Sequence, residues 1–280
     1  MKPRFYALLA MLLCTVTLAH GKSADKSTAP HKIAIEARRS AMNFDCIKAS
    51  HAIRIIVEER TSGNIIVRAP QSVMPYVSLK VSDGTLRASL LPGVPVPRRS
   101  NFAAEVYVPY NCKLEKIIAS SAARVIIKPT IACDELELSA SSSAVIEVKA
   151  GVRELSIDAS GASQVKAEVV ATELEADIVG ASTARLSGQA TKSEIDLSGA
   201  SRLHAADLRT SQLDLECSGA SKASAQGIDC SAQASGASAI NIECLQRLNA
   251  SASGASTIVY SGDCQVNIIS NTGTSSICKK

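Results

Sequence analysis

Hydrophobic residues recur at every second position through most of the chain after residue 118, and the alternation breaks at regular intervals. Each break contains a Gly or Ser, usually within the phrase Ser-Gly-Ala-Ser. Apolar positions stand two, four and six residues before that residue, and again four and six residues after it. Period-two alternation is typical of a strand with one buried face. The pattern therefore predicts two short strands joined by a bend, repeated along the chain.

The breaks lie at nearly constant spacing. Successive marker residues are separated by 21, 19, 19, 19, 20, 17, 18 and 19 positions. The markers are Ser121, Ser142, Gly161, Gly180, Gly199, Gly219, Gly236, Gly254 and Gly273. Repeats of this length cannot bury their apolar faces alone, so neighbouring copies must stack. The sequence predicts an all-β fold, a single-stranded right-handed parallel β-helix (a β-solenoid) with turns of about 19 residues.

Regular repeats fill residues 119–280, whereas residues 33–118 alternate less tidily and are expected to form irregular first turns and a cap. A third, weaker apolar position is expected to close each turn at Ile131, Val152, Val170, Leu208, Ile228 and Leu245. Within Ser-Gly-Ala-Ser, the Gly and the second Ser have the parity of inward-facing residues. We interpret this phrase as a structural corner rather than a nucleophile motif.

Residues 1–21 have a basic start, an apolar run and small residues near their end, which is typical of a secretory signal peptide. Residues 22–32 are polar and read as a flexible leader. No later segment has the ~20 apolar residues that a membrane-spanning helix needs, so membrane insertion is not expected. The mature chain is predicted to be periplasmic or on the outer surface of a Gram-negative cell.

Composition limits the chemistry. The chain is 46% hydrophobic but only 3% aromatic, has no Trp, and carries a formal net charge of +4. That small charge does not favour nucleic acid as a partner, and few aromatic rings are available to stack on sugars. Of four His residues, only His51 and His204 lie beyond the predicted signal and leader. No P-loop, zinc or nucleophile-elbow motif is present, so we expect a protein without catalytic residues.

Two candidate binding surfaces stand out. Tyr107 and Tyr110 lie close in sequence to Arg98 and Arg99 of a Pro-rich loop, which makes this region a candidate ligand patch. An acidic stripe is predicted along one wall, made of Asp158, Glu175, Asp177, Glu194, Asp196, Asp214 and Glu216. Adjacent carboxylates suit Ca²⁺, but the favoured interpretation is a solvated face partly balanced by a neighbouring basic stripe. That basic stripe would comprise Arg124, Lys149, Lys166, Arg185, Arg202 and Lys222. No other cofactor is implied.

Eight cysteines follow the predicted signal. Cys217 and Cys230 occupy inward columns and are expected to be small core residues. Cys112 with Cys133, and Cys244 with Cys264, fall near one column in consecutive turns. Each of these two pairs is expected to be either a disulfide or two stacked free thiols.

Three stretches before residue 126 resemble the putative auto-transporter adhesin head GIN domain family of Gram-negative bacteria, chiefly Bacteroidetes. They are "FDCIKASHAIRIIVEERTSGNIIVRAP", "VSLKVSDGTLRASL" and "AAEVYVPYNCKLEKIIASSAARV", and the recurring "SGAS" continues the likeness. The resemblance implies a secreted or periplasmic parallel β-helix. It implies no established activity.

The expected function is therefore a non-catalytic, exported adhesin or binding module of the cell envelope. Its flat walls would be presented to a glycan, an envelope component or a protein. The alternative is a carbohydrate-active enzyme, similar to a polysaccharide lyase or glycosidase, that uses an outer wall. The sequence leaves the ligand and the oligomeric state open.

Overall fold

Strands make up almost the whole fold. The computed structural model describes residues 33–39, 43–60, 63–94, 104–111 and 113–280. Within them the one helical element is a single 3₁₀ turn, η1 (Met74–Tyr76). The predicted signal and leader, residues 1–32, lie outside the described residues, as do Arg98, Arg99 and Cys112.

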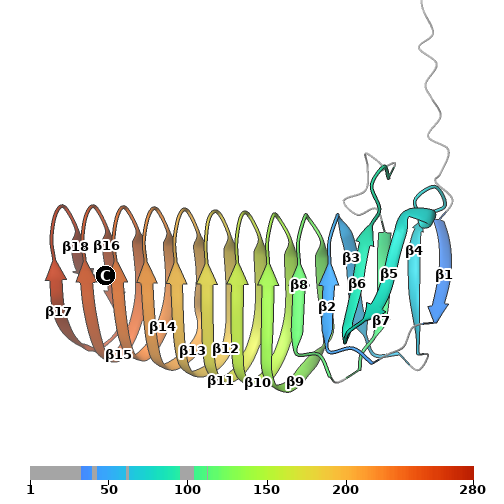
Figure 1. Cartoon of the computed structure of the whole chain (residues 1–280). Helices are drawn as coiled ribbons and strands as arrows, with labels where there is room; N and C mark the ends of the chain where they lie inside the picture. Colours follow the sequence, from blue (N-terminus) through green and yellow to red (C-terminus); the bar gives the residue numbers. More distant parts are fainter. Residues whose placement is uncertain (1–32, 40–42, 61–62, 95–103, 112) are drawn as a thin grey trace, which may run out of the picture. The chain divides into compact units, whose positions relative to one another are not determined.

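The regular repeats form one long curved strand per turn. These strands are β9 (Arg124–Ala140), β10 (Val145–Ala159), β11 (Gln164–Ile178), β12 (Thr183–Leu197), β13 (Arg202–Cys217), β14 (Lys222–Ala234) and β15 (Ala239–Ala252). Each pairs in parallel with the next, so that Leu155 lies opposite both Leu136 and Leu174. Figure 1 shows the repeated turns side by side. The predicted β-solenoid is confirmed. Between one Ser-Gly-Ala-Ser corner and the next, however, the two predicted strands are continuous, and each long strand curves through a second bend between them.

The stack ends in a turn made of shorter strands. They are β16 (Thr257–Ser261), β17 (Gln265–Asn271) and β18 (Ser276–Lys279). β16 and β17 both pair with β15, and β18 pairs with β16. Ile268 and Ile269 of β17 remain 52% and 67% exposed, so this turn buries less apolar surface than the turns before it.

The N-terminal strands join the same sheet out of sequence order. They are β1 (Ile33–Arg39), β2 (Cys46–Ala49), β3 (Ile53–Glu58), β4 (Asn64–Pro70), β5 (Val77–Ser82), β6 (Thr85–Leu90), β7 (Ala104–Pro109) and β8 (Lys116–Ala119). β2 lies between β6 and β8, and β3 lies between β7 and β9. The pairs β1–β4, β4–β7 and β5–β6 are antiparallel. Antiparallel strands at this end occupy an edge that would otherwise be open for pairing.

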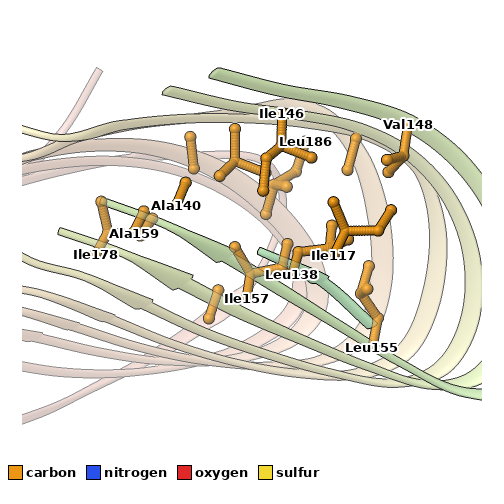
Figure 2. Close-up of a cluster of buried hydrophobic side chains, with 14 of the residues drawn as sticks. Ile117, Leu138, Ala140, Ile146, Val148, Leu155, Ile157, Ala159, Ile178 and Leu186 are labelled. Carbon is orange, nitrogen blue, oxygen red and sulfur yellow. The ribbon is translucent and has the colours of Figure 1, made fainter. Parts of the chain in front are cut away.

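The core is a set of aliphatic columns between two walls. In Figure 2, Ile117, Leu138 and Ile157 approach Ile146 and Leu186 from the opposite wall. The predicted columns before and after each marker are buried almost throughout, including Cys217 and Cys230, which are 2% and 4% exposed. Both cysteines are therefore core residues, as expected.

The prediction of a third inward-facing apolar column is correct for only three of its six residues. Ile131, Val152 and Leu208 are buried, but Val170 is 62%, Ile228 36% and Leu245 55% exposed. In β11 the inward residue is Val169, one position earlier. Because side chains alternate along a strand, a shift of one residue moves the side chain to the outer face.

In the Ser-Gly-Ala-Ser corner, the backbones of neighbouring turns lie in close contact at the Gly. The prediction that this Gly faces inward was wrong. The glycines lie at the exposed tip of each bend, with φ of +78° at Gly199 and +71° at Gly219. A Cβ on Gly219 would stand 2.6 Å from the carbonyl oxygen of Gly199 in the turn beneath it. Only Gly combines this left-handed conformation with so close a stacking contact.

The second Ser of each corner does face inward, as predicted, and its hydroxyl is not equally satisfied in every turn. Ser256 Oγ donates to the carbonyl oxygens of Ala234 at 3.0 Å and Ser253 at 2.8 Å. Ser201 Oγ is buried and has no hydrogen-bond partner among the described residues. A buried hydroxyl without a partner destabilises the fold, whereas a satisfied one contributes modestly.

Substituting these two serines is expected to give opposite results. Ser256→Ala should lower the free energy of unfolding by about 1–2 kcal/mol, because the carbonyl oxygens of Ala234 and Ser253 lose the hydrogen bond from this buried hydroxyl. Ser201→Ala should leave it unchanged or raise it by up to about 1 kcal/mol, because an unpaired hydroxyl is removed. Urea denaturation of both variants measures the difference, and a loss at Ser201 equal to that at Ser256 would contradict these roles of the two hydroxyls.

Candidate functional site

A groove crosses the second bend of the solenoid, on the outer surface where the strands curve from one wall to the other. It has a volume of about 630 Å³, and its lining comes from six consecutive strands, β10 to β15. The apolar part of the lining includes the exposed side chains of Val170, Ile228 and Leu245. These are the residues that the sequence pattern wrongly placed in the core.

Unequal turn lengths create this hollow. β13 has 16 residues and β14 has 13, and their pairing skips from Ala205 to Gln212. A turn with fewer residues follows a shorter path around the bend, so its outer surface lies closer to the solenoid axis than that of its longer neighbours. Gly227 lines the groove at this point, where a Cβ would come within 2.8 Å of Cys230 Sγ. The short turn therefore opens the groove, and it leaves no room for a side chain between Gly227 and the core beneath it.

Polar side chains line the groove beside the apolar ones. Parallel pairing places Val170, Gln189 and Arg209 in one row across β11, β12 and β13. Hydroxyl groups follow in the lining at Thr172, Thr191 and Ser211. Arg209 is exposed and has no acidic partner within the described part of the chain. The groove thus offers an unpaired cation, hydroxyl and amide groups, and an apolar surface.

Sequence reasoning missed this groove, although the signal was present. The spacing of the markers falls from 20 to 17 residues between Gly199, Gly219 and Gly236. Such a step in turn length marks a change in the outer contour of a solenoid. The three apolar residues were instead assigned to a third inward column, because the apolar residues that alternate along the strands of the repeat face inward.

The predicted tyrosine patch lies among ion pairs at the N-terminal turns. Tyr107 donates a hydrogen bond to Glu105 Oε2 at 3.1 Å, and its ring centroid lies 5.3 Å from the guanidinium carbon of Arg60. Tyr110 donates to the carbonyl oxygen of Thr130 at 3.1 Å. Both side chains are partly buried. The hydroxyl groups of both tyrosines and the ring of Tyr107 thus make contacts within the chain. The two arginines of the predicted patch, Arg98 and Arg99, lie outside the described residues.

One carboxylate in this region holds two cations. Glu58 accepts from Arg60 Nε at 2.7 Å and from Lys128 Nζ at 2.7 Å. Hydrogen bonds from these cations, chiefly Lys128, lower the pKa of Glu58. The network ties β3 to β9, so we interpret it as structural.

The acidic stripe is present as two ladders of stacked side chains. One row runs Asp158, Asp177, Asp196, Glu216 and Gln233, and the next runs Ser156, Glu175, Glu194, Asp214 and Ser231. Gln233 Nε2 donates to Glu216 Oε1 at 2.7 Å, which ends the first row with a neutral amide. Throughout the described residues no group of three or more His, Cys, Asp or Glu side chains is arranged to hold a metal ion. The Ca²⁺ hypothesis gains no support from this geometry.

Carboxylates inside a ladder resist ionisation. The pKa of Asp196 is raised by partial burial and then by the like charges of Glu216 and Asp177. The pKa of Asp158 is raised by partial burial and by Asp177. Because the folded chain binds these protons more tightly than the unfolded chain, the ladder destabilises the fold above the raised pKa values. This penalty disappears as pH falls below the ordinary carboxyl range, near 4.

Asp196→Asn is therefore expected to stabilise the protein at pH 7, by about 0.5 kcal/mol in low salt. The advantage should shrink as salt is added, and it should vanish as pH falls through about 4, where the native carboxyl is itself protonated. Thermal melts at several pH values measure it. Asp207→Asn, outside both rows, is the matched control. An unchanged or lowered melting temperature for Asp196→Asn at pH 7 would contradict the repulsion.

The predicted basic stripe does not form one continuous row. Arg124 lies opposite Val145, and Lys166 lies between Glu147 and Arg185. Acidic residues interrupt the cations and pair with them, as Lys149 Nζ does with Glu168 Oε2 at 2.7 Å. This wall is a mixed-charge surface with local ion pairs, because acidic residues share its outward positions.

Neither remaining histidine belongs to a catalytic arrangement of described residues. His204 is exposed on the outer face of β13, between Arg185 and Ser224 in register. His51 has φ of +59° at the corner between β2 and β3, and its Nδ1 lies 3.0 Å from Ser50 Oγ. That corner stacks on Ser121, because Ala52 N–H donates to the Ser121 carbonyl at 2.9 Å. His51 thus occupies the marker position of an additional turn that the repeat alignment did not include.

The stacked parallel turns and the outer groove define a β-solenoid with a ligand-sized surface depression. A family model described as "Putative auto-transporter adhesin, head GIN domain" matches residues 43–229. This match covers well over half of the chain, which therefore belongs to that family. A search of curated proteins finds no match.

Three solved structures show the same fold. A crystal structure described as a putative adhesin from Parabacteroides distasonis is 19% identical, with a TM-score of 0.65, and the match covers 90% of this chain and 98% of that one. A putative adhesin from Parabacteroides merdae is 20% identical, with a TM-score of 0.59 and coverage of 90% and 97%. A structure described as a "Putative lipid binding protein", also from P. distasonis, is 14% identical, with a TM-score of 0.65 and coverage of 90% and 98%.

Among the residues that the structure describes, no helix has the length and apolar character needed to cross a membrane.

Proposed function

We propose that this chain is an exported, non-catalytic adhesin module of the cell envelope, and that it binds a segment of another envelope protein in the groove of the second bend. The observation that carries the proposal is the exposure of Val170, Ile228 and Leu245 in that groove. Membership of an adhesin family and the signal-like residues 1–21 support export.

The chemistry of the groove favours a polypeptide over the other candidate ligands. A peptide brings apolar side chains together with backbone donors and acceptors, which match the apolar, hydroxyl and amide groups of the lining. A glycan would find no aromatic ring to stack on, because the described lining contains none. An acyl chain would bury Thr191 and Gln189 without hydrogen-bond partners, which is unfavourable.

Arg209 adds a preference within this class. Its guanidinium lies in the row of Val170 and Gln189, has no acidic partner in the described chain, and lines the groove. An unpaired Arg at a binding surface suits a carboxylate, which it can engage through two hydrogen bonds. We therefore expect the bound segment to combine apolar residues with an Asp or Glu.

Site-specific photo-cross-linking tests the proposal. A photoreactive amino acid replaces Thr191 in the groove and, as the control, His204 on the outer wall, in the full chain expressed in its native host. The expected result is one protein adduct from position 191 and none from position 204. A synthetic peptide covering the cross-linked segment should then bind the purified chain directly, and Arg209→Glu should weaken that binding by at least about tenfold.

The other results would each overturn part of the proposal. A lipid adduct at position 191 would replace the peptide with an amphiphile, the ligand class after which one similar structure is described. A glycan adduct would favour the sugar ligand. Equal adducts at both positions, or none at position 191, would contradict the groove as the binding surface.

A further inference from the structure

Three cysteines from successive turns meet beneath the groove floor. Cys230 belongs to β14 and Cys244 to β15, and Cys264 immediately precedes β17. Gly227 lies opposite Cys244 in register, and a Cβ on Gly227 would be 2.8 Å from Cys230 Sγ. The Cys230 thiol therefore lies next to Gly227, which is itself opposite Cys244 in the following turn.

Cys264 approaches Cys244 from the following turn. A Cβ on Gly262 would stand 2.1 Å from the Cys244 carbonyl oxygen, and Gln265 pairs with Arg247. The chain from Gly262 to Gln265 thus lies directly against the segment from Cys244 to Arg247. Cys244 Sγ donates to the carbonyl oxygens of Arg247 at 3.0 Å and Ile228 at 3.4 Å, so its thiol points toward the residue that pairs with Gln265, next to Cys264. All three are free thiols in this structure.

The three thiols differ in their access to solvent. Cys230 is 4% exposed and Cys244 is fully buried, whereas Cys264 is partly exposed. Burial raises the pKa of both Cys230 and Cys244, so few of these two thiols are ionised at neutral pH. Because the thiolate is the reactive species, an external oxidant reacts first with Cys264.

We propose that Cys244 and Cys264 form a disulfide when the chain meets a disulfide oxidant, such as oxidised glutathione or a thiol–disulfide oxidoreductase, while Cys230 stays reduced. The carbonyl oxygen of Arg247 accepts from Cys244 Sγ, and Arg247 pairs with Gln265, the residue after Cys264, across adjacent parallel strands about 4.8 Å apart. The two cysteines come from adjacent turns, and both side chains pack with the same hydrophobic core. Only one bridge can form at Cys244, and Cys264 is the partner that the oxidant reaches.

The chemistry proceeds in two exchange steps. The Cys264 thiolate attacks one sulfur of the oxidant, forms a mixed disulfide and releases one thiolate. The Cys244 thiol then loses its proton and attacks Cys264 Sγ, which forms the Cys244–Cys264 bond and releases the second thiolate. The two cysteines are oxidised, the oxidant is reduced to two thiols, and those thiols take up the two protons.

This bond would secure the least buried turn. β17 carries Ile268 and Ile269 at 52% and 67% exposure, and segments with little burial open most easily. A link between residues 244 and 264 attaches the start of β17 to β15. Oxidation should therefore slow the local opening of β17 and leave the binding groove in place above it.

Peptide mapping of the full chain tests the proposal. The purified protein is treated with oxidised glutathione or with dithiothreitol, then alkylated and digested under non-reducing conditions. We expect a Cys244–Cys264 peptide and a free Cys230 after oxidation, with amide exchange in β17 slowed at least about tenfold. Cys264→Ser should abolish both effects, whereas Cys230→Ser and the exposed Cys278→Ser should retain them.

Two results would overturn it: full alkylation of Cys244 and Cys264 after oxidation, or a bridge between Cys230 and Cys244. If Cys264→Ser failed to fold, the mapping of the unmodified chain would still decide between these outcomes. The experiment needs neither export nor a binding partner, so its result is independent of the proposed adhesin function.

Discussion

Replacing Gly219 with valine is expected to lower the free energy of unfolding by at least about 3 kcal/mol. Valine strongly disfavours the φ of +71° at this position, and its Cβ would lie 2.6 Å from the Gly199 carbonyl oxygen. The same contact recurs one turn earlier, where a Cβ on Gly199 would lie 2.8 Å from the Gly180 carbonyl oxygen. Urea denaturation followed by circular dichroism measures the loss, and Gly199→Val should behave alike.

Gly151→Val is the matched control. Gly151 lies within β10, and a Cβ there would have no atom within 4 Å outside its chain neighbours. Because its backbone is that of an ordinary strand, valine should be neutral or slightly stabilising at this position. If Gly219→Val were as stable as Gly151→Val, the corner would not be the constraint that sets the stacking of the turns.

Truncating Leu155 to alanine is the second change with a large expected effect, a loss of about 2–5 kcal/mol. Leu155 is fully buried and is stacked between Leu136 and Leu174 in one core column. The cavity would lie between two turns whose backbones are fixed by parallel hydrogen bonds, so the walls cannot collapse into it. The same denaturation experiment measures this loss.

Val170→Ala gives the comparison for Leu155→Ala. Val170 is 62% exposed, and its truncation should change stability by no more than about 0.5 kcal/mol. Similar losses at the two positions would contradict the assignment of Val170 to the groove and Leu155 to the core.

The regular part of the fold could be predicted from the sequence because its information is local. A period of two fixes which face is buried, and a period of about 19 fixes which residues stack. Leu136, Leu155 and Leu174 occupy the column expected of them. The inward second Ser of each corner follows from the same parity.

The remaining features depend on contacts that the period does not encode. β2 lies between β6 and β8, strands that follow it by many residues, and no local pattern specifies that pairing. The Gly tip of the corner escaped prediction because its constraint is a positive φ and a backbone contact rather than a buried side chain. The groove escaped because Val170 and Leu245 are apolar and were counted as core.

For the acidic ladders, residue type and repeat spacing were sufficient to predict which side chains stack. They were not sufficient to predict whether those side chains bind a metal ion. Asp158, Asp177 and Asp196 stack as expected from the repeat. Whether stacked carboxylates hold a cation depends on how closely their oxygens converge. On a wall of outward-facing strands, side chains lie in parallel rows and do not point to a common centre.

The central claim is that the groove of the second bend, with its exposed apolar side chains, binds a polypeptide. The most direct test is an affinity measurement on two matched variants. Val170→Asp changes the groove, and Leu91→Asp changes an apolar residue of similar exposure, 49% against 62%, near the N-terminal turns. Titration calorimetry with the peptide identified by cross-linking should show at least about tenfold weaker binding for Val170→Asp and unchanged binding for Leu91→Asp. Equal affinities for the two variants and the unmodified chain would contradict binding in the groove.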